Sequence, residues 1–299
     1  VAILGGKNPH IQNLCVGGVA TALNMENMAT LNMERIAYLR TLMEETRAFV
    51  KQVYYPDLIA IGSAYREWFK QGKGVVNYLA VPEFAEDTKN TSFALPGGLI
   101  MGGDLARARI ISDHHDQQLI GSIKESVACA WYEGRSTLHP WEGETKPDYT
   151  DFQENGKYSW CKAPRIDDKP IQVGPVAQLL AGYAAGNKRV RSLVDSTCSA
   201  VGVGVADLHS TMGRLAARGI RASLMSDLSL EYLDKLVDNV AKGDKAYANH
   251  TEIPRGEYRG VGFHEAPRGV LSHWMVIKDK KIKNYQAVVP STDRKSTRL

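Results

Sequence analysis

Apolar residues recur at three- and four-residue steps in several stretches, and each such stretch predicts an amphipathic helix. The longest of these begins at Asn32 and includes Met33, Ile36 and Leu39. It is predicted to end before Pro56, because proline cannot donate the next helical hydrogen bond. Further helices are predicted over residues 57–72, 116–131, 173–185, 207–217 and 230–240.

Strand signals are fewer and are concentrated near the C-terminus. Residues 270–277 form an apolar, β-prone run, residues 278–281 a charged turn, and residues 282–290 a second apolar run, which together predict a hairpin. Shorter apolar pieces between residues 75 and 103 are separated by prolines and glycines and predict a small sheet. The expected fold class is therefore mainly α (α+β), a helical core with small sheet insertions and a C-terminal hairpin.

Composition indicates a globular protein without a polyelectrolyte partner. The 299 residues are 43% hydrophobic, and 37 basic against 33 acidic residues leave a net charge of +4. Such a balance predicts no nucleic-acid partner. No apolar run approaches the roughly 20 residues of a membrane helix, and the first residues lack the features of a signal peptide. Because the sequence starts with Val1 rather than Met, we expect the natural start to lie upstream.

The four cysteines do not form a metal-binding pattern. Cys15, Cys129, Cys161 and Cys198 are widely spaced and form no C-x-x-C pair, so a thiolate cage from this chain alone is not expected. Four adjacent potential ligands occur at residues 113–116, but consecutive side chains seldom converge on one ion. Asp116 fits better as the N-cap of the helix that follows.

A single arginine stands at a rigid bend near the C-terminus. Pro267 fixes its own φ and Gly269 permits a close turn, so the Arg268 side chain leaves the backbone at a defined angle. A planar, always-charged guanidinium suits an anion or a polarised small ligand. The alternatives left open by the local pattern are a helix cap or an ion pair with Glu265.

Six segments in their order along the chain resemble one family. They are GGKNPH (5–10), NMER (32–35), LHPW (138–141), KYSW (157–160), STMGR (210–214), and EAPRG (265–269) with YQAVVPST (285–292). Together they resemble the large subunit of a nickel-iron hydrogenase of the uptake type. The resemblance covers residues 4–292, so we expect one partial large-subunit domain over residues 1–292 and a tail outside the family over residues 293–299.

The resemblance implies a function, cofactors and partners. It implies reversible heterolytic cleavage of H2 at a nickel-iron centre whose iron carries carbon monoxide and cyanide. It implies a small subunit with iron-sulfur clusters, a membrane cytochrome b subunit, and a location in a membrane-associated complex at the periplasmic face. In such proteins the arginine that matches Arg268 lies over the open face of the metal pair and assists heterolysis.

Further site residues are implied by the same resemblance. Pro267 and His10 would line the pocket, and Ser291 would hydrogen-bond a cyanide. The main-chain carbonyl of Ala287 would bind a Mg2+ ion. Glu142 and Lys162 would lie around that ion, although their surroundings in the sequence are equally typical of an ordinary surface ion pair.

The chain departs from the family at both ends. It lacks the two C-x-x-C motifs that hold nickel and iron, and it lacks the glutamate and histidine that complete the Mg2+ site. We therefore expect a central fragment that is inactive by itself. The alternative is a non-catalytic relative that serves as a subunit-docking scaffold in a redox complex, as in respiratory complex I. Ser291 and the apolar Val270 after Arg268-Gly269 favour the hydrogenase interpretation.

Overall fold

The computed structural model describes residues 2–8, 11–19, 32–87, 89–244, 248 and 252–290. The chain forms two compact units. The first comprises Val1–Asp57 and Arg221–Pro254, and the second comprises Leu58–Ile220 and Arg255–Leu299. Two helices, α3 (Tyr55–Ala64) and α7 (Thr211–Ala241), have residues in both units. Helices and small sheets occur together, which confirms the α+β class.

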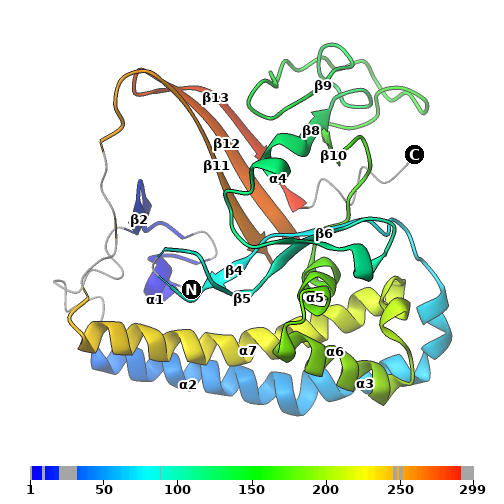
Figure 1. Cartoon of the computed structure of the whole chain (residues 1–299), viewed down its shortest axis with the longest axis vertical. Helices are drawn as coiled ribbons and strands as arrows, with labels where there is room; N and C mark the ends of the chain where they lie inside the picture. The colour runs from blue at the N-terminus through cyan, green and yellow to red at the C-terminus, as the bar shows by residue number, and fades with distance from the viewer. Residues whose placement is uncertain are drawn as a thin grey trace. The chain divides into compact units, whose positions relative to one another are not determined.

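The first unit is built on two helices that run side by side, α2 (Met33–Phe49) and the C-terminal part of α7 (Figure 1). Ile36 and Leu39 of α2 pack against Leu233 of α7. Asn32 caps α2 by accepting a hydrogen bond from the Arg35 amide at 2.9 Å, which confirms the predicted start of the helix. The unit also contains α1 (Ala2–Gly5), β1 (Leu14–Cys15) and β2 (Gly18–Val19).

The predicted helix end before Pro56 is wrong. The helix continues through a π-helical turn, η1 (Val50–Tyr54), into α3. In this turn the Tyr55 amide donates to the Val50 carbonyl five residues earlier. The wider turn accommodates a residue that has no amide hydrogen, so Pro56 changes the helical geometry without ending the helix.

Two further differences from the prediction concern α6 (Lys188–Val201) and α7. Residues 211–217 of one predicted helix and the whole of the predicted helix 230–240 belong to a single helix, α7. Helix α6 was not predicted, and it buries Val190, Val194 and Val201 at helical spacing. Residues 173–185 form α5 (Pro175–Ala184) as predicted, and η2 (Arg66–Lys70) and η4 (Val205–Leu208) are short 3-10 turns.

Among the described residues of the second unit, three small antiparallel sheets precede the C-terminal strands. One has the order β3 (Tyr78–Ala80), β6 (Gly97–Ile100), β7 (Arg109–Ile111), and α5 packs on β3 and β6. A second pairs β4 (Glu83–Ala85) with β5 (Phe93–Leu95). The third has the order β10 (Ala163–Ile166), β8 (Ile123–Ser126), β9 (Thr137–Leu138). The 3-10 turn η3 (Leu105–Arg107) precedes β7.

The helix predicted over residues 116–131 is much shorter than expected. Asp116 caps α4 (Gln117–Ser122) by accepting from the Leu119 amide, as predicted. The chain then becomes extended at Ile123, because β8 pairs with β10, a strand some forty residues further along. Local periodicity contains no information about that partner.

The C-terminal sheet consists of three long antiparallel strands, β11 (Glu257–Ala266), β12 (Gly269–Lys278) and β13 (Lys281–Val288) (Figure 1). The predicted hairpin β12–β13 is confirmed, with its turn at Asp279 and Lys280, both at positive φ. Strand β11 was not predicted, because its sequence is rich in glycine and exposed polar residues. Among the described residues, no helix is long and apolar enough to span a membrane.

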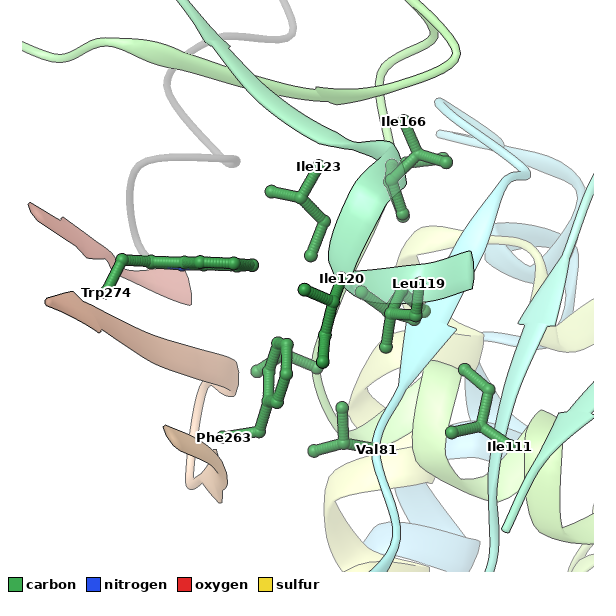
Figure 2. Packing of buried hydrophobic residues seen from close by; sticks show 11 residues of the cluster. Val81, Ile111, Leu119, Ile120, Ile123, Ile166, Phe263 and Trp274 are labelled. Atoms are coloured by element: carbon green, nitrogen blue, oxygen red, sulfur yellow. The ribbon is translucent and has the colours of Figure 1, made fainter. Parts of the chain in front are cut away.

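The main core of the second unit lies where this sheet meets α4 and β8. Trp274 of β12 is fully buried, and its ring lies edge-on to those of Trp141 and Phe263 at centroid distances of 5.2 and 5.8 Å. Figure 2 shows Trp274 directed toward Ile123, and Phe263 beside Ile120. This packing holds the strands that position Arg268.

Candidate functional site

Arg268 lies at the tip of the β11–β12 hairpin. Pro267 and Arg268 form a two-residue turn that is closed by the pairing of Ala266 with Gly269. Both turn residues are exposed. Within the described part of the chain, the Arg268 guanidinium has no hydrogen-bond or ion-pair partner, so neither the helix cap nor the Glu265 ion pair is formed. The side chain is therefore available to a ligand.

The hairpin tip rests on the N-terminus of α5. Gly269 has φ +125°, and a Cβ atom at this position would lie 2.5 Å from the Gly174 amide nitrogen and 2.6 Å from a Val173 methyl carbon. Only glycine permits so close an approach at this φ. The neighbouring Arg268 thus leaves a backbone whose position is determined by contact with a buried helix.

A buried glutamate fixes the other side of the tip. The Glu265 carboxylate accepts a hydrogen bond from the Val81 amide at 2.9 Å, and the Glu265 amide donates to Glu83 at 3.0 Å. The other Glu83 oxygen lies 3.0 Å from Nδ1 of His264. Burial alone would raise the pKa of Glu83, but hydrogen bonds from His264 and from the Glu265 amide outweigh it, and the pKa is lowered.

The lowered pKa of Glu83 makes the stability of this anchor pH-dependent. A carboxylate whose folded pKa is depressed stabilises the fold above its unfolded pKa, and this contribution is lost as pH falls through the folded pKa. We expect Glu83→Gln to lower the free energy of unfolding by about 1–3 kcal/mol near neutral pH. The difference from wild type should shrink as pH falls below the unfolded value of about 4.3.

Urea midpoints of the two proteins, measured at several pH values, test this expectation. Glu154→Gln is the control, because Glu154 is exposed and its replacement should change the midpoint little at any pH. A loss for Glu83→Gln that stays constant down to the acid limb would contradict the role given to this carboxylate.

A second group of polar side chains surrounds the end of β13. Lys162 Nζ donates to Gln286 Oε1 at 2.9 Å and lies 3.9 Å from Glu125 Oε2. Burial raises the pKa of Glu125 and lowers that of Lys162, although each charge opposes the shift of the other. Glu125 Oε2 is buried and has no hydrogen-bond donor among the described residues. Gln286 precedes Ala287, the residue expected to offer its carbonyl to Mg2+.

Glu142 and Lys162, both expected around the Mg2+ ion, form no ion pair with each other. Glu142 is exposed and lies 4.0 Å from Arg259, whereas the ammonium of Lys162 is directed to Glu125 and Gln286. His10 and Ser291 lie outside the described residues.

An apolar cavity of about 40 Å³ lies beside the hairpin tip. Its walls include Val173, which contacts Gly269, and Val270 and Val288 from β12 and β13. The volume accommodates a molecule about the size of water. Because the walls are mainly apolar, the cavity favours a small nonpolar molecule over a polar one.

No cluster of three His, Cys, Asp or Glu side chains suited to a metal ion occurs in the described part of the chain. This includes residues 113–116, where His114 Nε2 instead donates to the Pro82 carbonyl at 2.6 Å. Cys15, Cys129, Cys161 and Cys198 are all free thiols. The described residues therefore do not fit the thiolate ligand set of a nickel-iron centre.

Sequence reasoning missed the site roles of Glu83, Glu125 and Gln286, and it considered Glu265 only as an ion-pair partner of Arg268. Each is a polar residue at a strand position that faces the core. A signal was present for Glu125, which alternates with exposed Lys124 and shares the inward face with Ile123. This alternation indicates a buried position for Glu125 only once residues 123–126 are known to form a strand.

Comparison with known proteins extends over the whole chain. A profile of the nickel-dependent hydrogenase family matches residues 1–298. The Hydrogenase-2 large chain of Escherichia coli is 46% identical over 299 residues, covering 98% of this chain and 53% of that protein. The uptake hydrogenase large subunit of Bradyrhizobium diazoefficiens is 38% identical over 317 residues, covering 97% of this chain and 52% of that protein.

The fold agrees with the sequence comparison. An H2-activated [NiFeSe]-hydrogenase from Dm. baculatum superposes with a TM-score of 0.76 at 29% identity, covering 98% of this chain and 56% of that one. The chain thus spans about half the length of the curated relatives it matches. The motif order, the fold and both comparisons agree, and the chain belongs to the nickel-dependent hydrogenase family.

Proposed function

We propose that the full-length protein to which this chain corresponds is the large subunit of a nickel-iron hydrogenase that cleaves H2 reversibly into protons and electrons. The observation that supports this most directly is the placement of Arg268. Its guanidinium stands at a hairpin tip held by Gly269 on one side and Glu265 on the other, and it is exposed. Family membership gives this geometry its chemical context.

The chemistry of Arg268 follows from its position. A guanidinium stays charged at any relevant pH and can stabilise negative charge that develops near it without reorganising first. The adjacent apolar cavity suits a molecule as small and nonpolar as H2. Pro267 restricts the backbone of the turn, so the Cα atom from which the Arg268 side chain extends is held in a defined position. We give Arg268 the catalytic role and Pro267 a role in lining the pocket.

The proposed nickel-iron centre, with carbon monoxide and cyanide on iron, would supply the redox chemistry. Its thiolate ligands are not among the described residues, so this chain contributes the surroundings of the centre rather than its ligands. Within that proposal His10 lines the pocket and Ser291 hydrogen-bonds a cyanide.

A Mg2+ ion fits the polar group at the end of β13. Glu125 Oε2 is a buried acceptor without a hydrogen-bond donor in the described structure, which is what a metal-bound water would satisfy. Lys162 and Gln286 lie beside it. We propose that the Ala287 carbonyl binds the ion directly and that Lys162 and Glu125 contact its water. Glu142 would act at a greater distance, since it is exposed beside Arg259.

The proposed partners are a small subunit that carries iron-sulfur clusters and a membrane cytochrome b subunit. Two of the similar proteins are named as a large chain and a large subunit, which supports an assembly with a second chain. The name uptake hydrogenase of one relative supports association with a membrane complex, and we propose its periplasmic face as the location.

The test compares the full-length protein with its small subunit against the 299-residue chain alone. We expect the complex to reduce a viologen dye with H2 and to contain one nickel per large subunit, and the isolated chain to bind no stoichiometric nickel. A full-length protein that assembles with its partner yet holds no nickel and shows no turnover would replace this proposal with the scaffold alternative. One tightly bound nickel per isolated chain would overturn the assignment of the ligands.

A further inference from the structure

The segment STMGR at residues 210–214 has no role in the function proposed above, although its geometry is strongly constrained. Ser210 Oγ accepts a hydrogen bond from the Gly213 amide at 2.9 Å and so caps α7. A Cβ atom on Gly213 would lie 2.4 Å from the Leu208 Cα, so glycine is required for this close turn. The first turn of α7 therefore presents Arg214 in a fixed direction.

The Arg214 guanidinium connects α7 to two other segments, the backbone at residues 72–73 and the side chain of Gln172. Nη1 donates to the Gly72 carbonyl at 2.7 Å, and Nη2 donates to the Lys73 carbonyl at 2.8 Å. Nη2 and Nε both donate to Gln172 Oε1, at 2.8 and 3.3 Å. A planar fork with several donors can make these contacts at once, which a lysine ammonium cannot reproduce.

Gln172 connects this network to the hairpin tip. Its amide donates to the Asn77 carbonyl at 2.7 Å and its carbonyl accepts from the Leu79 amide at 3.1 Å, so the segment is fixed beside β3. The next two residues, Val173 and Gly174, are the ones that contact Gly269. Gln172, which accepts from Arg214, is therefore directly bonded to the two-residue segment on which the hairpin tip rests.

We propose that Arg214 is a positioning residue for Arg268. By holding Gln172, it fixes Val173 and Gly174, and these fix the hairpin tip through Gly269. Arg214 does not touch the reacting groups in this arrangement. The inference rests on the proposed function, in which Arg268 is the catalytic group. It makes catalysis depend on a second arginine, which lies some fifty residues earlier in the sequence.

The test is a double-mutant cycle in the full-length complex. We expect Arg214→Met to lower kcat for H2 oxidation on the order of 10- to 100-fold, because small displacements of a catalytic group have effects of that size. The same substitution in an Arg268→Lys background should cause little further loss, since Arg214 acts through Arg268. Arg218→Met, one turn later on α7, is the matched control and should leave kcat unchanged.

Hydrogen exchange supplies a measurement that does not depend on activity. The peptide that spans residues 266–270 should exchange faster in Arg214→Met than in wild type, with nickel content unchanged. Gln172→Met removes only the shared acceptor and should reproduce both effects. If Arg214→Met does not fold, Gln172→Met tests the positioning role in its place.

Equal losses of kcat in both backgrounds, or unchanged exchange at residues 266–270, would overturn the positioning role. Failure of the proposed function has a different signature. In that case Arg268→Lys alone would retain full turnover, while the exchange measurement would still show whether Arg214 holds the hairpin tip.

Discussion

Replacement of Arg268 by lysine is expected to remove most of the H2 turnover of the full-length complex while its nickel content stays the same. Lysine keeps the charge, but it concentrates that charge on a mobile ammonium and loses the planar fork. The Arg268 side chain has no partner among the described residues that its loss would leave unsatisfied, so the fold should not suffer. We expect kcat to fall on the order of 100-fold, as for the loss of one preorganised donor.

The measurement is dye reduction under H2, with nickel determined in the same preparation. Arg255→Lys is the control, because Arg255 is also exposed and lies just before β11, at the opposite end of that strand. Turnover close to wild type in Arg268→Lys would contradict the role of the guanidinium. A parallel loss of nickel would show instead that Arg268 is needed for assembly of the centre.

Trp274→Ala is expected to destabilise the second unit by about 3–5 kcal/mol, the range observed when a buried aromatic residue is truncated. Trp274 is fully buried, and its ring contacts those of His139, Trp141 and Phe263. Its Nε1 also donates to Ser272 Oγ at 2.8 Å, so the substitution leaves a buried hydroxyl without that donor.

Urea unfolding followed by far-ultraviolet circular dichroism measures this effect without relying on tryptophan emission. Trp68→Ala is the matched control, because Trp68 is 45% exposed and lies in a short 3-10 turn. If the midpoint shifts no more for Trp274 than for Trp68, the core around β12 is not what stabilises this unit. Such a result would also weaken the argument that this core positions the hairpin tip.

Features that depend on neighbouring residues were predictable from the sequence. Asp116 caps a helix as predicted, and the helix predicted to begin at Asn32 is capped by that residue, since a capping side chain reaches an amide only three residues away. The β12–β13 hairpin was predictable because its charged turn lies directly between two apolar runs. The rigid bend at residues 267–269 was equally predictable, because Pro267 restricts its own φ and Gly269 permits a φ that other residues rarely adopt.

Features that depend on distant residues were not predictable in this way. The α4 helix ends at Ser122 because β8 pairs with β10, and the helix continues past Pro56 because a π-helical turn accommodates the proline. Packing likewise joins two predicted helices into α7. For α4, pairing with a distant strand outweighs a local helix preference that amounts to a few kcal/mol at most, whereas at Pro56 the backbone itself changes its hydrogen-bonding pattern.

The same distinction between local and distant residues applies to the candidate site. By itself the sequence determined the family, through six segments in a fixed order, and the conformational limits on the turn that carries Arg268. Only the tertiary structure decided what that turn rests on and which polar side chains are buried near it. Four residues that organise the site are far from Arg268 in sequence: Glu83, Glu125, Gln172 and Gly174. Hydrogen bonds, an ion pair and close contacts between distant segments hold them in place.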